Sequence, residues 1–182
     1  MKPQNISILL ILFIAILFGC KKEDPPNPVE FITTLNFTLI PEGGGPPIVL
    51  SHKDLDGPGG DPPIVIGATL DSTSSYSASI ELLDESVSPV KNLTAEIKNE
   101  AEDHQFFFEV VAGILSLGIF DMDEDANGNP LGLVSTARTG SPGAGGTFRI
   151  TLIHKPEKSF FTVLANAGGE TDIVANFDIV VQ

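Results

Sequence analysis

The sequence predicts a mainly β protein, an antiparallel β-sandwich with one short α-helix near residues 92–103. Several segments alternate apolar and polar residues with a period of two, which is typical of strands with one buried face. The 18 glycines and 14 prolines of the 182-residue chain cluster between these segments, as turn residues do. One stretch alone has helical spacing of its apolar residues.

The first and last alternations are the best defined. In the range 31–40, four apolar residues share one face of the predicted strand: Phe31, Leu35, Phe37 and Leu39. In the range 173–181, alternate positions are again apolar: Ile173, Ala175, Phe177, Ile179 and Val181. Between them we predict strands at 48–50, 64–69, 76–82, 105–111, 114–123, 131–139 and 148–152. A turn at Ala112-Gly113 is expected to join the strands 105–111 and 114–123.

The predicted helix spans about Asn92 to Asp103. Asn92 is a good N-cap residue, because its side chain can accept a hydrogen bond from a free N–H of the first turn. One narrow apolar stripe recurs every fourth residue: Leu93, Ile97 and Ala101. Acidic residues occupy another face, which we expect to be solvated: Glu96, Glu100 and Asp103.

The number of strands narrows the fold class further. Eight or nine short strands separated by turns favour an immunoglobulin-like sandwich, with a small closed barrel as the alternative. The Cys…Trp…Cys core of antibody domains is absent, because the chain has one Cys and no Trp. No segment of 20–50 residues repeats, so we do not expect a solenoid or a propeller.

The N-terminus has the features of a secretory signal peptide. Lys2 gives a positive start, and the apolar run Ile6–Phe18 is too short to span a bilayer. The run ends in Leu17-Phe18-Gly19-Cys20, which resembles a bacterial lipobox, although the usual pattern has a smaller residue in place of Phe18. The resemblance implies diacylation of Cys20, cleavage before it and acylation of the new N-terminus. Several acyl chains would anchor the protein stably.

Three regions follow from this interpretation: a signal peptide (1–19), a lipidated Cys with a Pro-rich tether (20–30), and one sandwich domain (31–182). Removal of 19 residues would leave 163 residues, and the loss of Lys2 would change the net charge from −14 to −15. Lys22-Glu23-Asp24 resembles the charged export signal of Bacteroidota surface lipoproteins. The alternative is a solvating tether that faces the periplasm.

Composition excludes several classes of function. With 10 basic and 24 acidic side chains, the chain lacks the positive charge that nucleic-acid binding needs. The single Cys excludes an internal disulfide, a zinc-finger site and a CxxC redox pair. The sequence has no nucleophile elbow and no phosphate-binding glycine loop. It therefore indicates no catalytic residues.

The segment 123–129 reads D-x-D-x-N-G-N and resembles the first half of an EF-hand calcium loop. Calcium prefers six to eight oxygen ligands, and the candidates here are Asp123, Asp125, Asn127 and Asn129. The twelfth position is Val134, where the EF-hand has a bidentate Glu, so another loop would have to supply that carboxylate. The alternative is an acidic hairpin turn at Asn127-Gly128.

A second acidic loop and three histidines are weaker candidates. The loop holds Asp54, Asp56 and Asp61, which are either calcium ligands or residues of a solvated turn. Three His can form a zinc site, but His52, His104 and His154 are widely spaced. We expect His104 to cap the C-terminus of the helix instead.

Taken together, the lipobox and several further segments resemble a group of small, largely uncharacterised envelope lipoproteins of the Bacteroidota. The other segments are the Asp-rich glycine loop, Asp84-Glu85, Glu102–Phe108, Asn127–Leu133 and Asn166–Asp172. The resemblance implies a location in the cell envelope and transfers no activity and no site.

We therefore expect a lipid-anchored protein of the bacterial envelope, on the periplasmic or the surface face of the outer membrane. Its expected role is that of a non-enzymatic binding module that uses the sandwich loops, with calcium as a candidate stabiliser. One alternative is an envelope hydrolase with paired carboxylates. Another is a metal- or haem-acquisition accessory that uses His104 or His154.

Overall fold

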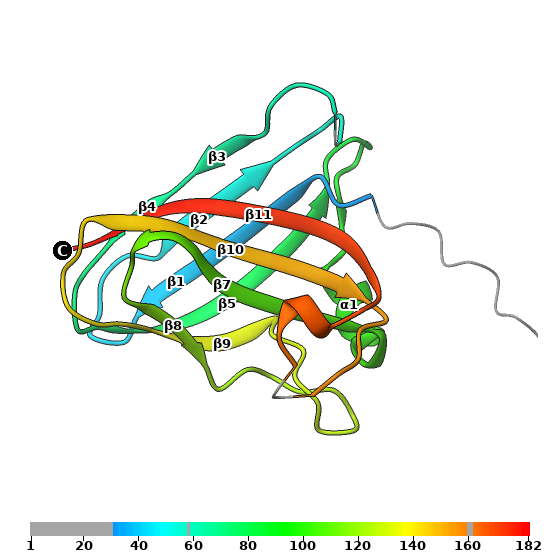
Figure 1. Ribbon diagram of the computed structural model, residues 1–182. Helices are drawn as coiled ribbons and strands as arrows, with labels where there is room; N and C mark the ends of the chain where they lie inside the picture. Colours follow the sequence, from blue (N-terminus) through cyan, green and yellow to red (C-terminus); the bar gives the residue numbers. More distant parts are fainter. Residues whose placement is uncertain (1–30, 58, 160–161) are drawn as a thin grey trace, which may run out of the picture.

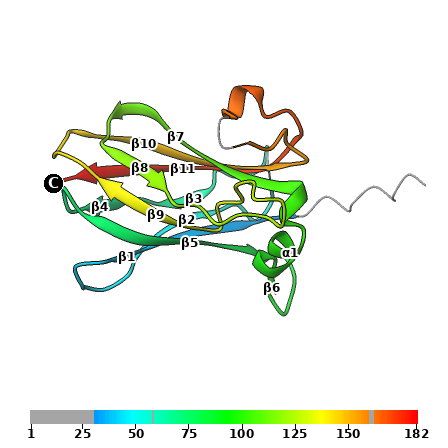
Figure 2. The same cartoon turned by 90° about the horizontal axis from the view of Figure 1, so that it is seen from below.

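The computed structural model describes residues 31–57, 59–159 and 162–182. The expected signal peptide, Cys20 and the tether lie outside the described residues. Within the described ranges the chain folds into two β-sheets that pack face to face (Figures 1 and 2). The mainly β sandwich predicted from the sequence is confirmed.

The larger sheet has the strand order β3-β2-β1-β5-β9-β8, and the short strand β6 also pairs with β5. Its strands are β1 (Thr34–Pro41), β2 (Ile48–Lys53), β3 (Ile64–Ile66), β5 (Ser75–Asp84), β6 (Lys91–Asn92), β8 (Leu117–Phe120) and β9 (Val134–Thr139). The smaller sheet has the order β4-β11-β10-β7 and consists of β4 (Ala68–Leu70), β7 (His104–Ile114), β10 (Gly145–His154) and β11 (Glu170–Val181). The named strands pair antiparallel, except that β11 and β4 run parallel.

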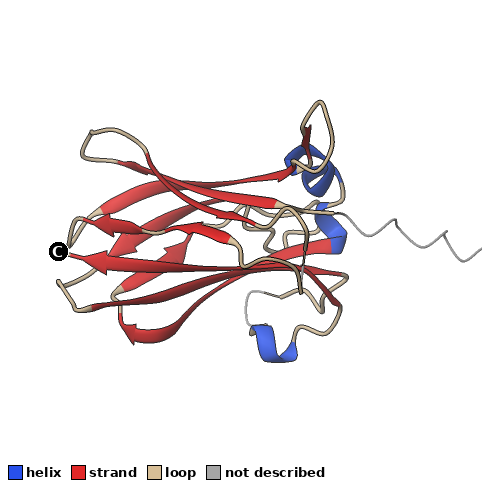
Figure 3. Ribbon diagram, turned by 90° about the horizontal axis from the view of Figure 1, so that it is seen from above, coloured by secondary structure: helices blue, strands red, loops and turns tan. Residues whose placement is uncertain are grey.

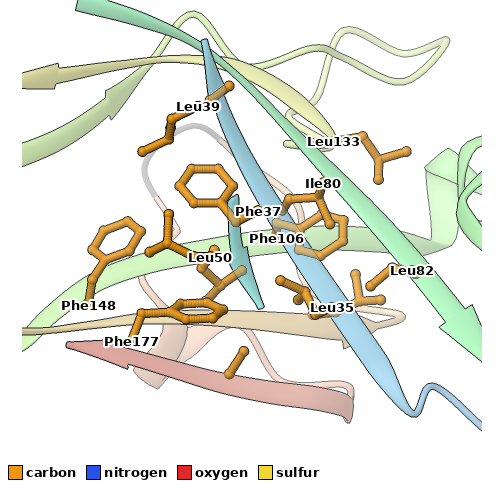
Figure 4. Close-up of a cluster of buried hydrophobic side chains, with 14 of the residues drawn as sticks. Leu35, Phe37, Leu39, Leu50, Ile80, Leu82, Phe106, Leu133, Phe148 and Phe177 are labelled. Atoms are coloured by element: carbon orange, nitrogen blue, oxygen red, sulfur yellow. The ribbon is translucent and has the colours of Figure 1, made fainter. Parts of the chain in front are cut away.

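The core lies between the two sheets, where the alternating residues of both inner faces meet (Figure 4). Leu35, Phe37 and Leu39 of β1 are fully buried, as their period of two predicted. Burying one such side chain contributes about 1.5–3 kcal/mol, so the two sheets hold each other in place. Phe31 precedes β1 and is 45% exposed, so its expected place on the buried face is wrong.

The segment predicted as one strand over 64–69 forms two strands in different sheets. β3 ends the larger sheet and β4 ends the smaller one, and Gly67 connects them. A Cβ atom at Gly67 would lie 2.0 Å from the backbone oxygen of Asp178. The crossing between sheets therefore needs glycine at this position, a constraint that the apolar pattern does not reveal.

The turn expected at Ala112-Gly113 is also wrong. β7 continues through Gly113 to Ile114, and the chain then crosses to β8 in the larger sheet. Gly113 has a positive φ of 80°, and a Cβ atom there would lie 2.4 Å from the backbone oxygen of Gly145. The glycine serves a close approach of β7 to β10, not a hairpin.

The predicted helix is confirmed as α1 (Thr94–Asn99), followed by a short 3₁₀ turn, η1 (Ala101–Asp103). It begins two residues after Asn92, whose side-chain oxygen accepts the N–H of Thr94 at 3.0 Å. A second 3₁₀ turn, η2 (Leu164–Asn166), lies between β10 and β11. These helical segments gather at the end of the sandwich where β1 begins, opposite the C-terminus (Figure 3). Among the described residues, no helix has the length and apolar character needed to cross a membrane.

Candidate functional site

The candidate calcium loop lies in the connection between β8 and β9 and forms a tight turn. The N–H of Gly128 donates to the backbone oxygen of Asp125 at 3.1 Å. The N–H of Asp125 donates to the backbone oxygen of Asn129 at 2.8 Å. Gly128 has a positive φ of 78°. The turn predicted from Asn127-Gly128 is therefore present, within a loop and not between two long strands.

The two central carboxylates of this loop bind the loop's own backbone. Oδ1 of Asp123 accepts the N–H groups of Gly132 and Val134, at 2.9 and 3.0 Å. Oδ1 of Asp125 accepts the N–H groups of Asn127 and Asn129, both at 2.9 Å. A calcium ion at these oxygens would compete with the hydrogen bonds that shape the loop.

Lys158 is a residue of this site that the sequence did not indicate. Its Nζ lies 2.8 Å from Oδ2 of Asp125 and donates to the backbone oxygen of Ala101 at 2.5 Å. Burial disfavours the charged form of Asp125, but Lys158 and the two N–H groups outweigh that effect and keep the pKa of Asp125 below its usual value. Calcium binding by Asp123, Asp125, Asn127 and Asn129 stays a prediction. Among the described residues, no three His, Cys, Asp or Glu side chains lie close enough to hold one metal ion.

The second acidic loop connects β2 and β3, and its carboxylates also bind nearby backbone. Oδ1 of Asp54 accepts the N–H of Gly57 at 2.9 Å, and Oδ2 of Asp56 accepts the N–H of Asp61 at 2.8 Å. These are the local hydrogen bonds that favour Asp in turns. The weaker calcium candidate formed by Asp54, Asp56 and Asp61 likewise stays a prediction.

An acidic hollow of about 420 Å³ lies between the helix and the candidate calcium loop. Its acidic side chains come from two segments that the sequence analysis treated separately: Glu100, Glu102, Asp103, Asp123, Glu124 and Asp125. Lys98 also lines it. The hollow concentrates negative charge at the helical end of the sandwich, because the helix and the loop are packed together there.

The structure brings two of the three histidines together. His104 and His154 are register partners at the ends of β7 and β10, and their rings stack with centroids 4.9 Å apart and planes 11° apart. His104 is 1% exposed, so it is poorly accessible to a metal ion or haem in solvent. His52 lies on β2, where burial lowers its pKa. The sequence could not predict the His104–His154 contact, because only the pairing of β7 with β10 creates it.

A groove lies between β7 and β8. β7 is the last strand of the smaller sheet and β8 is the last strand of the larger sheet. The groove has a volume of about 250 Å³, and its apolar side chains include Phe106, Phe108, Val110, Leu117, Ile119 and Met122. We call it the edge groove. Thr162, Val163 and Leu164, in the connection between β10 and β11, also line it.

The floor of the edge groove is aromatic and continuous with the core. The ring of Phe108 lies 6.2 Å from the rings of Phe37 and Phe148, and 6.5 Å from the ring of Phe106. These separations are typical of packed aromatic pairs. The floor of the groove is therefore part of the packed core.

Comparisons with protein-family models, with curated proteins and with solved structures found no match to this chain.

Proposed function

We propose that the protein is a lipid-anchored binding module of the bacterial cell envelope, and that its edge groove holds an extended peptide segment of a partner protein. The signal-peptide features of residues 1–19 and the lipobox ending in Cys20 support the anchor. Three acyl chains at one terminus would hold a domain of this size at a membrane.

The edge groove is the main support for a binding role. An edge strand offers its outer row of backbone N–H and C=O groups to a further strand, and many domains bind peptides in this way. At β7 this row begins next to Phe106, whose N–H already donates to the backbone oxygen of Leu131 at 2.7 Å. Beyond that point no described strand pairs with this side of β7.

The lining of the groove indicates the chemistry of the peptide. Alternate residues of an added strand would point toward the apolar side chains of Phe108, Leu117 and Ile119. The full sequence carries a net charge of −14, which removal of residues 1–19 would make −15, so a partner with basic residues beside its apolar ones would be attracted over a longer range.

Site-specific photocrosslinking in intact cells tests this proposal. A benzoylphenylalanine would replace Val110, which lines the groove and is 42% exposed. The matched control is Val180 of β11, which is 40% exposed and is not part of the groove. We expect a discrete crosslinked partner from position 110 and none from position 180. Equal adducts from both positions, or none from either, would contradict the proposed groove.

A Cys20→Ser variant of the same strain separates anchoring from binding. We expect this variant to leave the membrane fraction, because it lacks the acylated side chain. If it stays in the membrane fraction although residues 1–19 have been removed, the anchor is wrong, whatever the crosslinks show.

A further inference from the structure

A β-bulge in β11 places one carboxylate beside the stacked histidines. Leu152 of β10 pairs with Ile173, and Ile153 pairs with Thr171, so Asp172 is the extra residue between them. Regular alternation would point Asp172 away from the face that Ile173 shares with the core. A bulge redirects the side chain of its extra residue, and such bulges are frequent beside functional sites.

The redirected carboxylate is buried and lacks a hydrogen-bond donor. Oδ2 of Asp172 lies 3.7 Å from Nε2 of His104, and the Asp172 side chain is 10% exposed. No described group donates a hydrogen bond to this oxygen. A buried charge without a donor is costly, so the position favours any cation that can reach it.

The orientation of the His104 ring indicates that the cation beside Oδ2 of Asp172 is a proton. Nδ1 of His104 lies 3.0 Å from the backbone oxygen of Glu100. A carbonyl oxygen can only accept, so this contact assigns the ring hydrogen to Nδ1. In the neutral ring, Nε2 is then an acceptor and faces the acceptor Oδ2 of Asp172. One added proton turns this pair of acceptors into a donor and an acceptor.

The charges around the pair come from three elements. Glu100 and Asp103 act on His104 from the helical segment, and His154 acts on it from β10. On Asp172, His154 acts from β10 and Glu170 acts from its own strand. Burial is the largest influence on both groups: it lowers the pKa of His104 and raises the pKa of Asp172 to about 6.

The stacked histidines do not suit a metal ion as the shared cation. Zinc binds imidazole nitrogen at about 2.0–2.1 Å, and its ligands must converge on one point. The rings of His104 and His154 are nearly parallel, with centroids 4.9 Å apart, so they do not converge.

We propose that His104 and Asp172 bind one solvent proton between them at mildly acidic pH and so form a pH-sensitive link between β7 and β11. The proton adds to Nε2 of His104 or to Oδ2 of Asp172, no other bond changes, and the net charge rises by one. The two atoms then approach to about 2.7–2.9 Å, the length of a charge-assisted hydrogen bond. The link lies at the helical end of the sandwich and does not depend on the edge groove.

An NMR titration of the full-length protein in detergent micelles tests the link, with ¹³C-labelled Asp and ¹⁵N-labelled His. We expect the Asp172 carboxyl carbon to shift with a midpoint near pH 6, and the His104 ring nitrogens to report the same transition. In an Asp172→Asn variant, the His104 transition should move to lower pH, because the carboxylate that holds the proton is gone. A Glu170→Gln variant should keep the joint transition, since Glu170 is exposed.

Independent midpoints, with Asp172 titrating near 4, would overturn the proposal. A joint transition that persists in the Asp172→Asn variant would also overturn it. Stoichiometric Zn²⁺ binding that abolishes the transition in the wild-type protein would assign the site to a metal and overturn the proton link.

Discussion

Lys158 and Asp125 form a buried ion pair between two connections that lie far apart in the sequence. Nζ of Lys158 is 2.8 Å from Oδ2 of Asp125, and the two side chains are 6% and 1% exposed. Lys158 lies between β10 and β11, and Asp125 lies between β8 and β9. The pair therefore connects loops of the smaller sheet and the larger sheet at the helical end of the sandwich.

Loss of the lysine charge should destabilise the protein strongly. A Lys158→Met variant keeps the apolar stem but leaves the Asp125 carboxylate buried without its partner. Removing one partner of a buried ion pair costs about 3–5 kcal/mol. We therefore expect urea denaturation to give a free energy of unfolding that is lower by this amount for the Lys158→Met variant.

The matched control is Lys91→Met. Lys91 lies 2.8 Å from Glu96, but these side chains are 56% and 41% exposed. Exposed pairs contribute about 0–1 kcal/mol. If both variants lost less than about 1 kcal/mol, the structural role assigned to Lys158 would be wrong.

The Asp172→Asn variant should be more stable than the wild-type protein at neutral pH. Burial raises the pKa of Asp172 from 3.8 to about 6. A carboxyl with a higher pKa in the folded state opposes folding when ionised, so its penalty is full above pH 6 and fades toward pH 4. The expected gain is up to about 3 kcal/mol at pH 7.5.

Urea denaturation at pH 7.5 and pH 4.5 measures this difference. The gain of the Asp172→Asn variant should shrink by at least half at the lower pH, because the wild-type carboxyl is then protonated in the folded state. A Glu170→Gln variant should show no such dependence. A gain that is equal at both pH values would mean that Asp172 is not a buried, titrating carboxyl.

The hydrogen-bonded turn of residues 123–129 predicts that millimolar calcium leaves the melting temperature of the protein unchanged, whereas the calcium site predicted from the sequence requires a rise. Oδ1 of Asp123 and both carboxylate oxygens of Asp125 already bind backbone N–H groups or Lys158. A ligand that binds only the folded state would raise the melting temperature by mass action. A rise that disappears in an Asp123→Asn variant would instead establish the predicted calcium site.

The sequence predicted the strands well where one face is buried, because a period of two is a direct consequence of the pleat. Leu35, Phe37 and Leu39 are examples, and so are Ala175, Phe177 and Ile179 at the other end of the chain. It did not predict which strands share a sheet. Gly67 and Gly113 looked like parts of a strand and a turn, whereas their roles depend on backbone from distant strands.

The candidate site was less predictable than the fold, because contacts between distant residues determine it. The turn at Asn127-Gly128 is local and was predicted. Asp125 forms an ion pair with Lys158, and the ring of His104 stacks on that of His154. The residues of each pair are too far apart in the sequence for a motif to reveal the contact. The edge groove arises from the strand order of two sheets, which no alternation encodes.

Mass spectrometry of the N-terminal peptide, from protein purified out of native membranes, tests the central claim most directly. The proposed function predicts a mature chain that begins at Cys20 and carries a diacylglyceryl group and an N-acyl chain. A soluble protein that still carries residues 1–19, with an unmodified Cys20, would contradict it.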